Sequence, residues 1–314
     1  MIQHLENKAI DKAKWDACID NSTNGMVYAY AWYLDIVSPG WEGLVGDDYK
    51  SVMPLPMAEK YGFRYTYPPP YIQQLGLFSS TDIAEKAVTV FIAHIPAKYK
   101  YIEMNLNEQN PFSGKDFKIT KGVTHLLNLD KPYGEILSSF STQTKRNLKK
   151  AQAASLTITK EAPIEKVIEL FRDNRGKQYS HNSTNYDILS RLMLACKQKG
   201  IGHSWGIYNK ENELCAGAFF LISNGRSIFL FSGANDNAYE THAMTFLINK
   251  FIEEHSAQNL IFDFEGSLDK DLARFYKGFG STETIYLQIR KNTLPLPVKL
   301  LKEFQYRRKT SAGR

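Results

Sequence analysis

The chain has 314 residues, of which 43% are hydrophobic and 23% charged, an ordinary globular composition that suffices for one large or two medium domains. The formal net charge of +6 belongs to residues 291–314, which hold seven basic groups and one acid, Glu303, while the remaining charges balance. The total therefore does not indicate a protein body coated with positive charge for nucleic acid.

Cysteine and histidine usage argues against disulfide and metal chemistry. Cys18, Cys196 and Cys215 are widely spaced and odd in number, and the seven histidines show no ligand spacing. No apolar stretch has the form of a signal peptide or reaches the roughly 20 residues of a membrane span. We therefore expect a soluble, cytoplasmic protein with no metal site and no disulfide framework.

The first half of the chain alternates helical and extended patterns. Helical patterns are expected around 15–19, 28–36 and 81–94, and Ser80 or Thr81 is a candidate cap for the last of these. Three consecutive prolines at 68–70 should end the first sheet segment, because proline cannot donate to a central ladder. Extended runs are expected at 41–46, 51–57, 63–67, 71–78 and 101–106.

The second half repeats this order. The helix near Thr81 precedes a strand at Tyr101 by the same spacing that separates a helix near Glu240 from a strand at Leu260, without detectable identity between the halves. We therefore predict two mixed α/β domains, 1–131 and 132–290, followed by a basic tail, 291–314. Helices are expected at 133–155 (one long helix), 164–178, 185–199, 241–255 and 272–276, and strands at 205–208, 215–222, 227–231, 260–264 and 284–290.

Several chemistries lack their sequence signatures. The chain has no GxxxxGK[ST] phosphate loop, no GxGxxG after a strand, no GxSxG elbow and no HExxH motif. Nucleotide hydrolysis, dinucleotide redox chemistry, α/β-hydrolase chemistry and zinc-protease chemistry are therefore not predicted.

Four cations crowd the segment from Ser141 to Lys150. At helical spacing, Lys145 and Lys149 share one stripe, and Arg146 and Lys150 the adjacent one. Such a cluster can hold phosphates through charge and bidentate guanidinium bonds. The pattern alone favours a solvated helix face.

Two carboxylates close an apolar strand at 260–267. Asp263 and Glu265 should point to one face and Phe262 and Phe264 to the other. A partly buried carboxylate beside a like charge has a raised pKa and can deprotonate an attacking amine. The alternative is that one of them caps the next helix or pairs with an arginine. We favour the functional interpretation, because Gly266 and Ser267 allow close backbone approach.

Two further segments are weaker candidates. Ser232, Gly233 and Asn235 lie between a strand and a helix, where free backbone N–H groups can bind an anion, although Asp236 and Glu240 disfavour a diphosphate there. Around the prolines, aromatic and amide groups on a rigid turn suit a sugar or a peptide, with a turn packed under the sheet as the alternative. These groups are Tyr71, Gln73 and Gln74.

Three stretches resemble a known family. They are the S-x-x-x-[KR]-R-x-[IL]-[KR]-[KR]-A helix at 141–151, the F-D-F-x-G-S strand end at 262–267 and the F-[KY]-x-G-F-G turn at 275–280. With the element order of 200–290, they are similar to the FemAB group of aminoacyl and peptidyl transferases, a branch of the GNAT acyltransferases. The resemblance covers about 15–290 and implies two tandem GNAT-like domains.

The resemblance implies transfer of an acyl or aminoacyl group onto an amine, with acyl-CoA or aminoacyl-tRNA as co-substrate and no covalently bound cofactor. It places Asp263, Glu265 and Ser267 at the reaction centre. Donor contacts would be Lys145, Arg146, Lys149, Ser232, Gly233, Asn235, Tyr276 and Lys277, and acceptor contacts Tyr71, Gln73 and Gln74. The chain lacks the glycine-rich diphosphate loop of acetyl-CoA users. It also has Tyr276 where many relatives have a lysine, with Lys277 one position later.

We therefore expect a transferase in which the amine attacks the activated acyl group directly. Asp263 or Glu265 would assist deprotonation, and backbone N–H groups near Gly233 and Asn235 would bind the oxyanion. The acceptor would be a small molecule or a peptidoglycan precursor; an acyl-CoA-dependent N-acyltransferase and a catalytically silent binding module are the alternatives. Candidate partners are tRNA and, through the basic tail, an anionic membrane, but not DNA. For the tail itself we favour a solvated, partly disordered terminus over a basic amphipathic helix.

Overall fold

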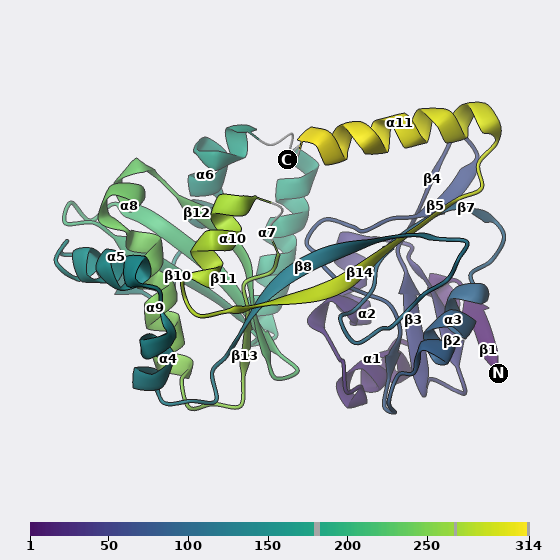
Figure 1. The fold of residues 1–314 in the computed structure, drawn as a ribbon, viewed down its shortest axis with the longest axis horizontal. Helices are drawn as coiled ribbons and strands as arrows, with labels where there is room; N and C mark the ends of the chain where they lie inside the picture. Colours follow the sequence, from purple (N-terminus) through teal and green to yellow (C-terminus); the bar gives the residue numbers. More distant parts are fainter. Residues whose placement is uncertain (179–182, 267–268, 313–314) are drawn as a thin grey trace. The chain divides into compact units, whose positions relative to one another are not determined.

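The computed structural model describes residues 1–178, 183–266 and 269–312, which form two compact units (Figure 1). Unit 1 comprises Met1–Val123 and Thr284–Arg314, and unit 2 comprises Thr124–Glu283. Strands β8 (Lys118–Asn128) and β14 (Thr282–Asn292) each contribute to both units. This division differs from the expected boundaries at 131 and 290, because β14 and the helix after it return to unit 1.

Unit 1 contains two groups of paired strands. The first has the order β1-β2-β3-β6 and is antiparallel throughout. The second has the order β4-β5-β7-β14-β8, with β5 and β7 parallel and β7 and β14 antiparallel. Besides β8 and β14, the strands of unit 1 are β1 (Ile2–Leu5), β2 (Glu42–Gly46), β3 (Ser51–Leu55), β4 (Met57–Lys60), β5 (Phe63–Thr66), β6 (Phe78–Ser79) and β7 (Tyr99–Asn105).

Helix α3 covers an apolar sheet face of unit 1. Side chains of helix α3, including Val88 and Phe91, share a core with Leu44, Met104 and Ile289. Alternation along β7 therefore sends Ile102 and Met104 into this core and Tyr101, Glu103 and Asn105 to the opposite face. The helices are α1 (Lys12–Asn21), α2 (Ala31–Val37), α3 (Glu85–Ala93) and α11 (Leu296–Ala312).

Unit 2 is built on a mixed sheet in which β8 is followed in order by β13, β12, β11, β10 and β9. The pair β12–β13 is parallel for three residue pairs, after which β13 ends at Asp263 while β12 continues. The other described pairs of this unit are antiparallel. The strands are β9 (Thr157–Thr159), β10 (Gly202–Tyr208), β11 (Leu214–Ser223), β12 (Arg226–Ala234) and β13 (Ile261–Asp263).

Helices cover both faces of the unit 2 sheet (Figure 1). On one face, an aromatic core joins Phe220 and Phe262 to Phe251 of helix α9. On the other, Val167 of helix α6 lies against Gly217 of β11. The helices are α4 (Tyr133–Ser139), α5 (Thr142–Gln152), α6 (Ile164–Asp173), α7 (Ser183–Gln198), α8 (Asp236–Thr241), α9 (Ala243–His255) and α10 (Lys270–Lys277).

Several expected elements differ in extent. The predicted long helix at 133–155 is two helices, because Phe140 is extended and the Ser141 side chain caps α5 by accepting from the Thr144 amide. The helix expected from Thr81 begins only at Glu85. Of the extended run expected at 71–78, the structure contains an isolated parallel bridge between Leu75 and Leu106 and the start of β6. Strands β1, β4, β8 and β9 were not predicted.

Residues 296–312 of the C-terminal tail form helix α11, where a solvated, partly disordered terminus was expected. Helix α11 contacts the polar face of unit 1 through Glu303, which accepts hydrogen bonds from Arg290 and Asn292. Within the described part of the chain, no helix is both long and apolar enough to cross a bilayer.

Candidate functional site

The three sequence motifs meet in the core of unit 2. Phe264, which follows β13, stacks on Phe279 with ring centroids 5.7 Å apart and lies 5.0 Å from Tyr276. Phe279 in turn meets Phe140, which precedes α5, edge-on at 5.2 Å. The strand end at 262–267, the turn at 275–280 and the helix at 141–151 are therefore parts of one packed structure.

Glycines in the turn make this contact possible. The backbone amide of Ser141 donates to the Gly278 carbonyl at 2.8 Å, and a Cβ on Gly278 would overlap the Thr144 hydroxyl. Gly280 has φ of +78°, and a Cβ there would overlap Ser139. The motif thus fixes the start of α5 against the turn after α10.

Asp263 is fully buried and holds three hydrogen bonds. Its Oδ2 accepts from Arg226 Nη1 at 2.7 Å, and its Oδ1 accepts from the Thr124 hydroxyl at 2.5 Å and from the Glu265 amide at 2.9 Å. Burial raises the pKa of the Asp263 carboxyl, whereas Arg226, Thr124 and the Glu265 amide oppose the rise. Asp263 is therefore paired with an arginine, which was the alternative interpretation of the sequence.

This arrangement makes Asp263 a support for the turn that carries Glu265. Glu265 has φ of +56°, a left-handed conformation that is uncommon for a residue with a side chain, and its amide is fixed by Asp263. The Glu265 side chain is half-buried, and its charge adds to burial in raising the pKa of Tyr276. Glu265 thus lies beside a buried phenol at the end of β13. Ser267 lies outside the described residues.

An acidic cap and a cation border the same turn. Asp269 caps α10 by accepting from the amides of Asp271 and Leu272, and it pairs with Arg175 at 2.6 Å. Among the described residues, no group of His, Cys, Asp and Glu is arranged to hold a metal ion.

His125 was not among the site residues predicted from the sequence. It lies on β8, its backbone carbonyl accepts from the Phe264 amide at 3.0 Å, and its buried ring lies 6.0 Å from that of Tyr276. Neither ring nitrogen has a hydrogen-bond partner, and burial, followed by the charge of Lys277, lowers the His125 pKa. A neutral imidazole thus borders the Tyr276 phenol. No local signal marks it, since β8 itself was not predicted.

The predicted donor cations lie on the surface of α5. Lys145, Arg146 and Lys149 are exposed, and Lys145 Nζ donates to the Ser138 carbonyl at 2.7 Å, close to the end of α4. Two further predicted donor contacts differ from each other: Tyr276 is buried, whereas Lys277 is exposed and paired with Glu283 at 2.7 Å.

The structure corrects the expectation of open backbone amides at the end of β12. The Asn235 amide donates to the Cys215 carbonyl at 3.0 Å, and its side chain caps α8. Gly233 lies against α6, so that a Cβ there would be 2.6 Å from the Phe171 amide nitrogen. Ser232 is half-buried and pairs with Ala218. These residues pack strand against helix.

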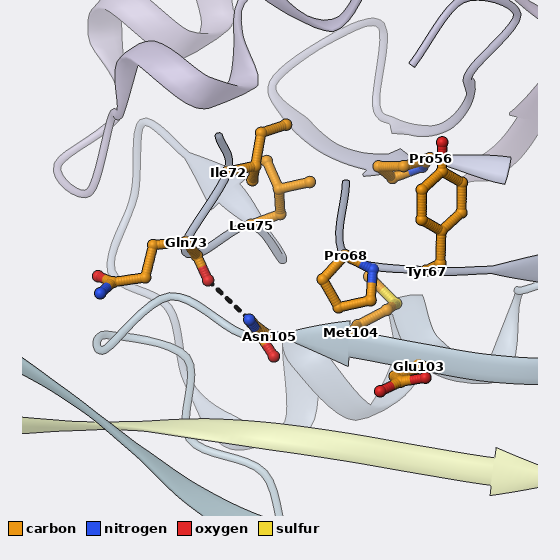
Figure 2. Close-up of a pocket in the computed structure, with 9 residues that line it drawn as sticks. All are labelled: Pro56, Tyr67, Pro68, Ile72, Gln73, Leu75, Glu103, Met104 and Asn105. Atoms are coloured by element: carbon orange, nitrogen blue, oxygen red, sulfur yellow. Dashed lines mark hydrogen bonds between the residues drawn. The ribbon is translucent and has the colours of Figure 1, made fainter. Parts of the chain in front are cut away.

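One predicted acceptor residue, Gln73, lines a pocket in unit 1 (Figure 2). Its carbonyl accepts from Asn105 Nδ2 at 2.9 Å, and Glu103 lies on the same wall. Tyr71 and Gln74 do not line this pocket: Tyr71 has φ of +63°, and the fully buried Gln74 accepts from the Glu108 amide. The free space is narrow, with room for about one water-sized group.

Glu103 and Asn105 also belong to a polar sheet face that the sequence analysis did not identify. On β14, Gln288 and Arg290 pair with Asn105 and Glu103, and Gln288 Nε2 donates to Asn105 Oδ1 at 3.2 Å. A second pocket opens here, lined in part by Thr120 of β8. The signal was present in the alternating polar residues of both strands, but their pairing joins segments far apart in sequence.

The sequence matches no protein-family model and no curated protein, whereas solved structures match over nearly the whole chain. The chain has the fold of FemX. The two share 15% identity and a TM-score of 0.65, covering 95% of this chain and 99% of FemX. L-PGS from Bacillus licheniformis follows at 10% identity and a TM-score of 0.56, covering 97% and 98%. The C-terminal domain of a protein assigned as a lysylphosphatidylglycerol synthetase from Agrobacterium fabrum has 9% identity and a TM-score of 0.54, covering 95% and 96%.

These matches confirm the predicted mixed α/β class and the tandem arrangement of the FemAB resemblance at the level of the fold. Each match covers both units, so the likeness is not confined to one repeat. At such identities the residues of the site have to be argued from this chain alone.

Proposed function

We propose that the protein is a transferase that moves an acyl or aminoacyl group onto an amine acceptor. The observation that supports this most strongly is the FemX fold across both units, combined with a carboxylate, Glu265, held on a strained turn at the end of β13. FemX and the lysylphosphatidylglycerol synthetases favour an aminoacyl donor over a simple acetyl donor.

In the proposed reaction, the acceptor nitrogen attacks the carbonyl carbon of an activated ester or thioester. A C–N bond forms, the bond from carbonyl carbon to the leaving oxygen or sulfur breaks, and the nitrogen loses one proton. Glu265 accepts that proton and passes it to the leaving group. Asp263 acts as a positioning residue, because its hydrogen bond to the Glu265 amide holds the turn.

The proposed substrate contacts follow from charge and exposure. Lys145, Arg146 and Lys149 offer exposed cations to donor phosphates, as CoA or tRNA would supply. In unit 1, Gln73, Glu103 and Asn105 line a space of about the size of one amino group, and their amide and carboxylate groups suit the amine of a polar acceptor such as a peptidoglycan precursor.

The first test is transfer activity of Glu265→Gln. We expect a loss of roughly 100- to 10,000-fold in kcat, the usual contribution of a general base, with an unchanged thermal midpoint. Glu211→Gln is the matched control, because Glu211 is an exposed glutamate that pairs with Lys210, outside the residues assigned to the site. Full activity of a folded Glu265→Gln variant would remove Glu265 from the mechanism.

The donor is identified by thermal shift, since a ligand that binds the folded state raises the midpoint. Stabilisation by aminoacyl-tRNA that Lys145→Ala/Lys149→Ala abolishes supports the aminoacyl donor. Stabilisation by CoA thioesters alone shows an acyl-CoA-dependent N-acyltransferase instead. Binding of an acceptor without turnover of either donor shows a catalytically silent binding module.

A further inference from the structure

Helix α11 of unit 1 exposes an apolar side to solvent. Leu296, Leu300, Leu301 and Phe304 are 69%, 62%, 57% and 54% exposed. Their spacing of four, five and eight residues from Leu296 places them on one side of the helix. Together they form an exposed apolar surface on consecutive turns of one element, unlike scattered single apolar residues, which need no explanation.

The polar side of the same helix faces the protein. Glu303 accepts from Arg290 Nη1 at 2.9 Å and from Asn292 Nδ2 at 3.0 Å. Lys302 Nζ lies 4.7 Å from the centre of the Tyr101 ring, and the Arg290 guanidinium lies 3.8 Å from the centre of the Tyr306 ring. An ordinary surface helix buries its apolar stripe and exposes its charges, so α11 is inverted.

The orientation of α11 also determines the sign of the charge on its solvent side. Glu303 is the only acid among residues 291–314, against seven basic groups, and it is turned inward onto Arg290. Lys299, one residue before the exposed leucine pair, is exposed. Among the described side chains, the solvent side of α11 therefore combines the leucines with the positive charge of Lys299.

We propose that α11 docks flat on an anionic phospholipid bilayer, with its leucines in the interface and Lys299 at the headgroups. Apolar side chains flanked by cations are what such a surface binds. A second copy of this chain would present the same positive charge, and a polyanion such as RNA would leave the leucines in water. This inference is independent of the proposed transferase activity.

The test is co-sedimentation of the full-length protein with vesicles. Vesicles of equal amounts of phosphatidylglycerol and phosphatidylcholine should bind the protein, vesicles of phosphatidylcholine alone should bind it at least about tenfold less, and salt should weaken the binding. Leu300→Asp/Leu301→Asp should reduce partitioning at least about tenfold, because two apolar side chains no longer enter the interface.

Leu194→Asp on α7 is the matched control, since Leu194 is a leucine 44% exposed on a helix of unit 2, and it should bind vesicles as the parent does. Circular dichroism and the thermal midpoint verify folding, and Leu300→Gln/Leu301→Gln replaces the aspartate variant if that variant unfolds. Equal binding to both vesicle types, or unchanged binding of a folded leucine variant, overturns the proposal. So does a dimer in light scattering that the leucine substitutions dissociate.

Discussion

The two units repeat one element order but treat polar residues on their central strands in opposite ways. In unit 2, the acid on β13, Asp263, is fully buried in an ion pair with Arg226. In unit 1, the acid on β7, Glu103, faces a polar sheet surface with two pockets. The comparison shows that the two copies of a duplicated fold can share their layers and still differ at their central strands. Unit 2 buries the acid of its strand, whereas unit 1 leaves the polar groups of its strand accessible.

The two units also differ in the free energy that the loss of one charge should cost. A buried ion pair is costly to form from water and more costly to break by removing one partner, because the other charge is then left unpaired at low dielectric. The pair on the polar face of unit 1, Arg290 with Glu303, is milder, since the Glu303 side chain is 30% exposed. The units should therefore respond differently to removal of one charge.

The largest effect is expected in unit 2. Arg226→Met leaves Asp263 buried and charged without its cation, which should cost about 3–5 kcal/mol of unfolding free energy. Urea unfolding measures the loss, and hydrogen exchange of β12 and β13 peptides assigns it to unit 2. The double variant Arg226→Met/Asp263→Asn should recover part of the stability. A loss below about 1 kcal/mol for the single variant would contradict the comparison.

An intermediate effect is expected where strand meets helix in unit 2. Gly233→Ala places a Cβ 2.6 Å from the Phe171 amide nitrogen and should cost about 1–3 kcal/mol through strain. The control is Gly134→Ala in α4, where no atom lies within 4 Å of the new Cβ. Thermal unfolding should show the control as stable as the parent or slightly more stable. Equal thermal midpoints for the two variants would contradict this prediction and show that α6 moves away from the new Cβ at little energetic cost.

The smallest effect is expected in unit 1. Burial alone would raise the pKa of Glu303, but Asn292 and Arg290 outweigh it and the pKa is lowered. A carboxyl with a lowered pKa stabilises the fold above its unfolded pKa of about 4.3 and loses this contribution as the pH falls. Glu303→Gln should therefore cost about 1 kcal/mol or less at pH 7, and the cost should shrink as the pH is lowered to 3. Urea titrations at both pH values test this, and a loss independent of pH would contradict it.

Sequence patterns predicted the repeat and most elements, because apolar periodicity and turn residues are local properties. They failed where distant contacts decide. The expected long helix breaks at Phe140, since the amide of the next residue bonds to the Gly278 carbonyl. Strand β8 escaped prediction because its two halves belong to different units and so follow no single pattern of burial.

The candidate site was predicted to a similar extent. The pairing of Asp263 with an arginine was foreseen as an alternative, but its partner Arg226 lies on another strand, which no local pattern identifies. The amides near Gly233 and Asn235 were expected to be open because a strand followed by a helix often leaves them so. Here the neighbouring strand and helix α6 cover them.

The passage of β8 and β14 through both units has a consequence for the order of folding. Unit 2 is one uninterrupted segment, whereas unit 1 needs residues 284–314 to supply β14 beside β7 and Ile289 to its core. During synthesis, unit 2 is complete before the last strand of unit 1 has been made. We therefore expect the usual sequence, in which the N-terminal domain folds first, to be reversed, because β7 keeps one edge unpaired until the segment made last supplies β14.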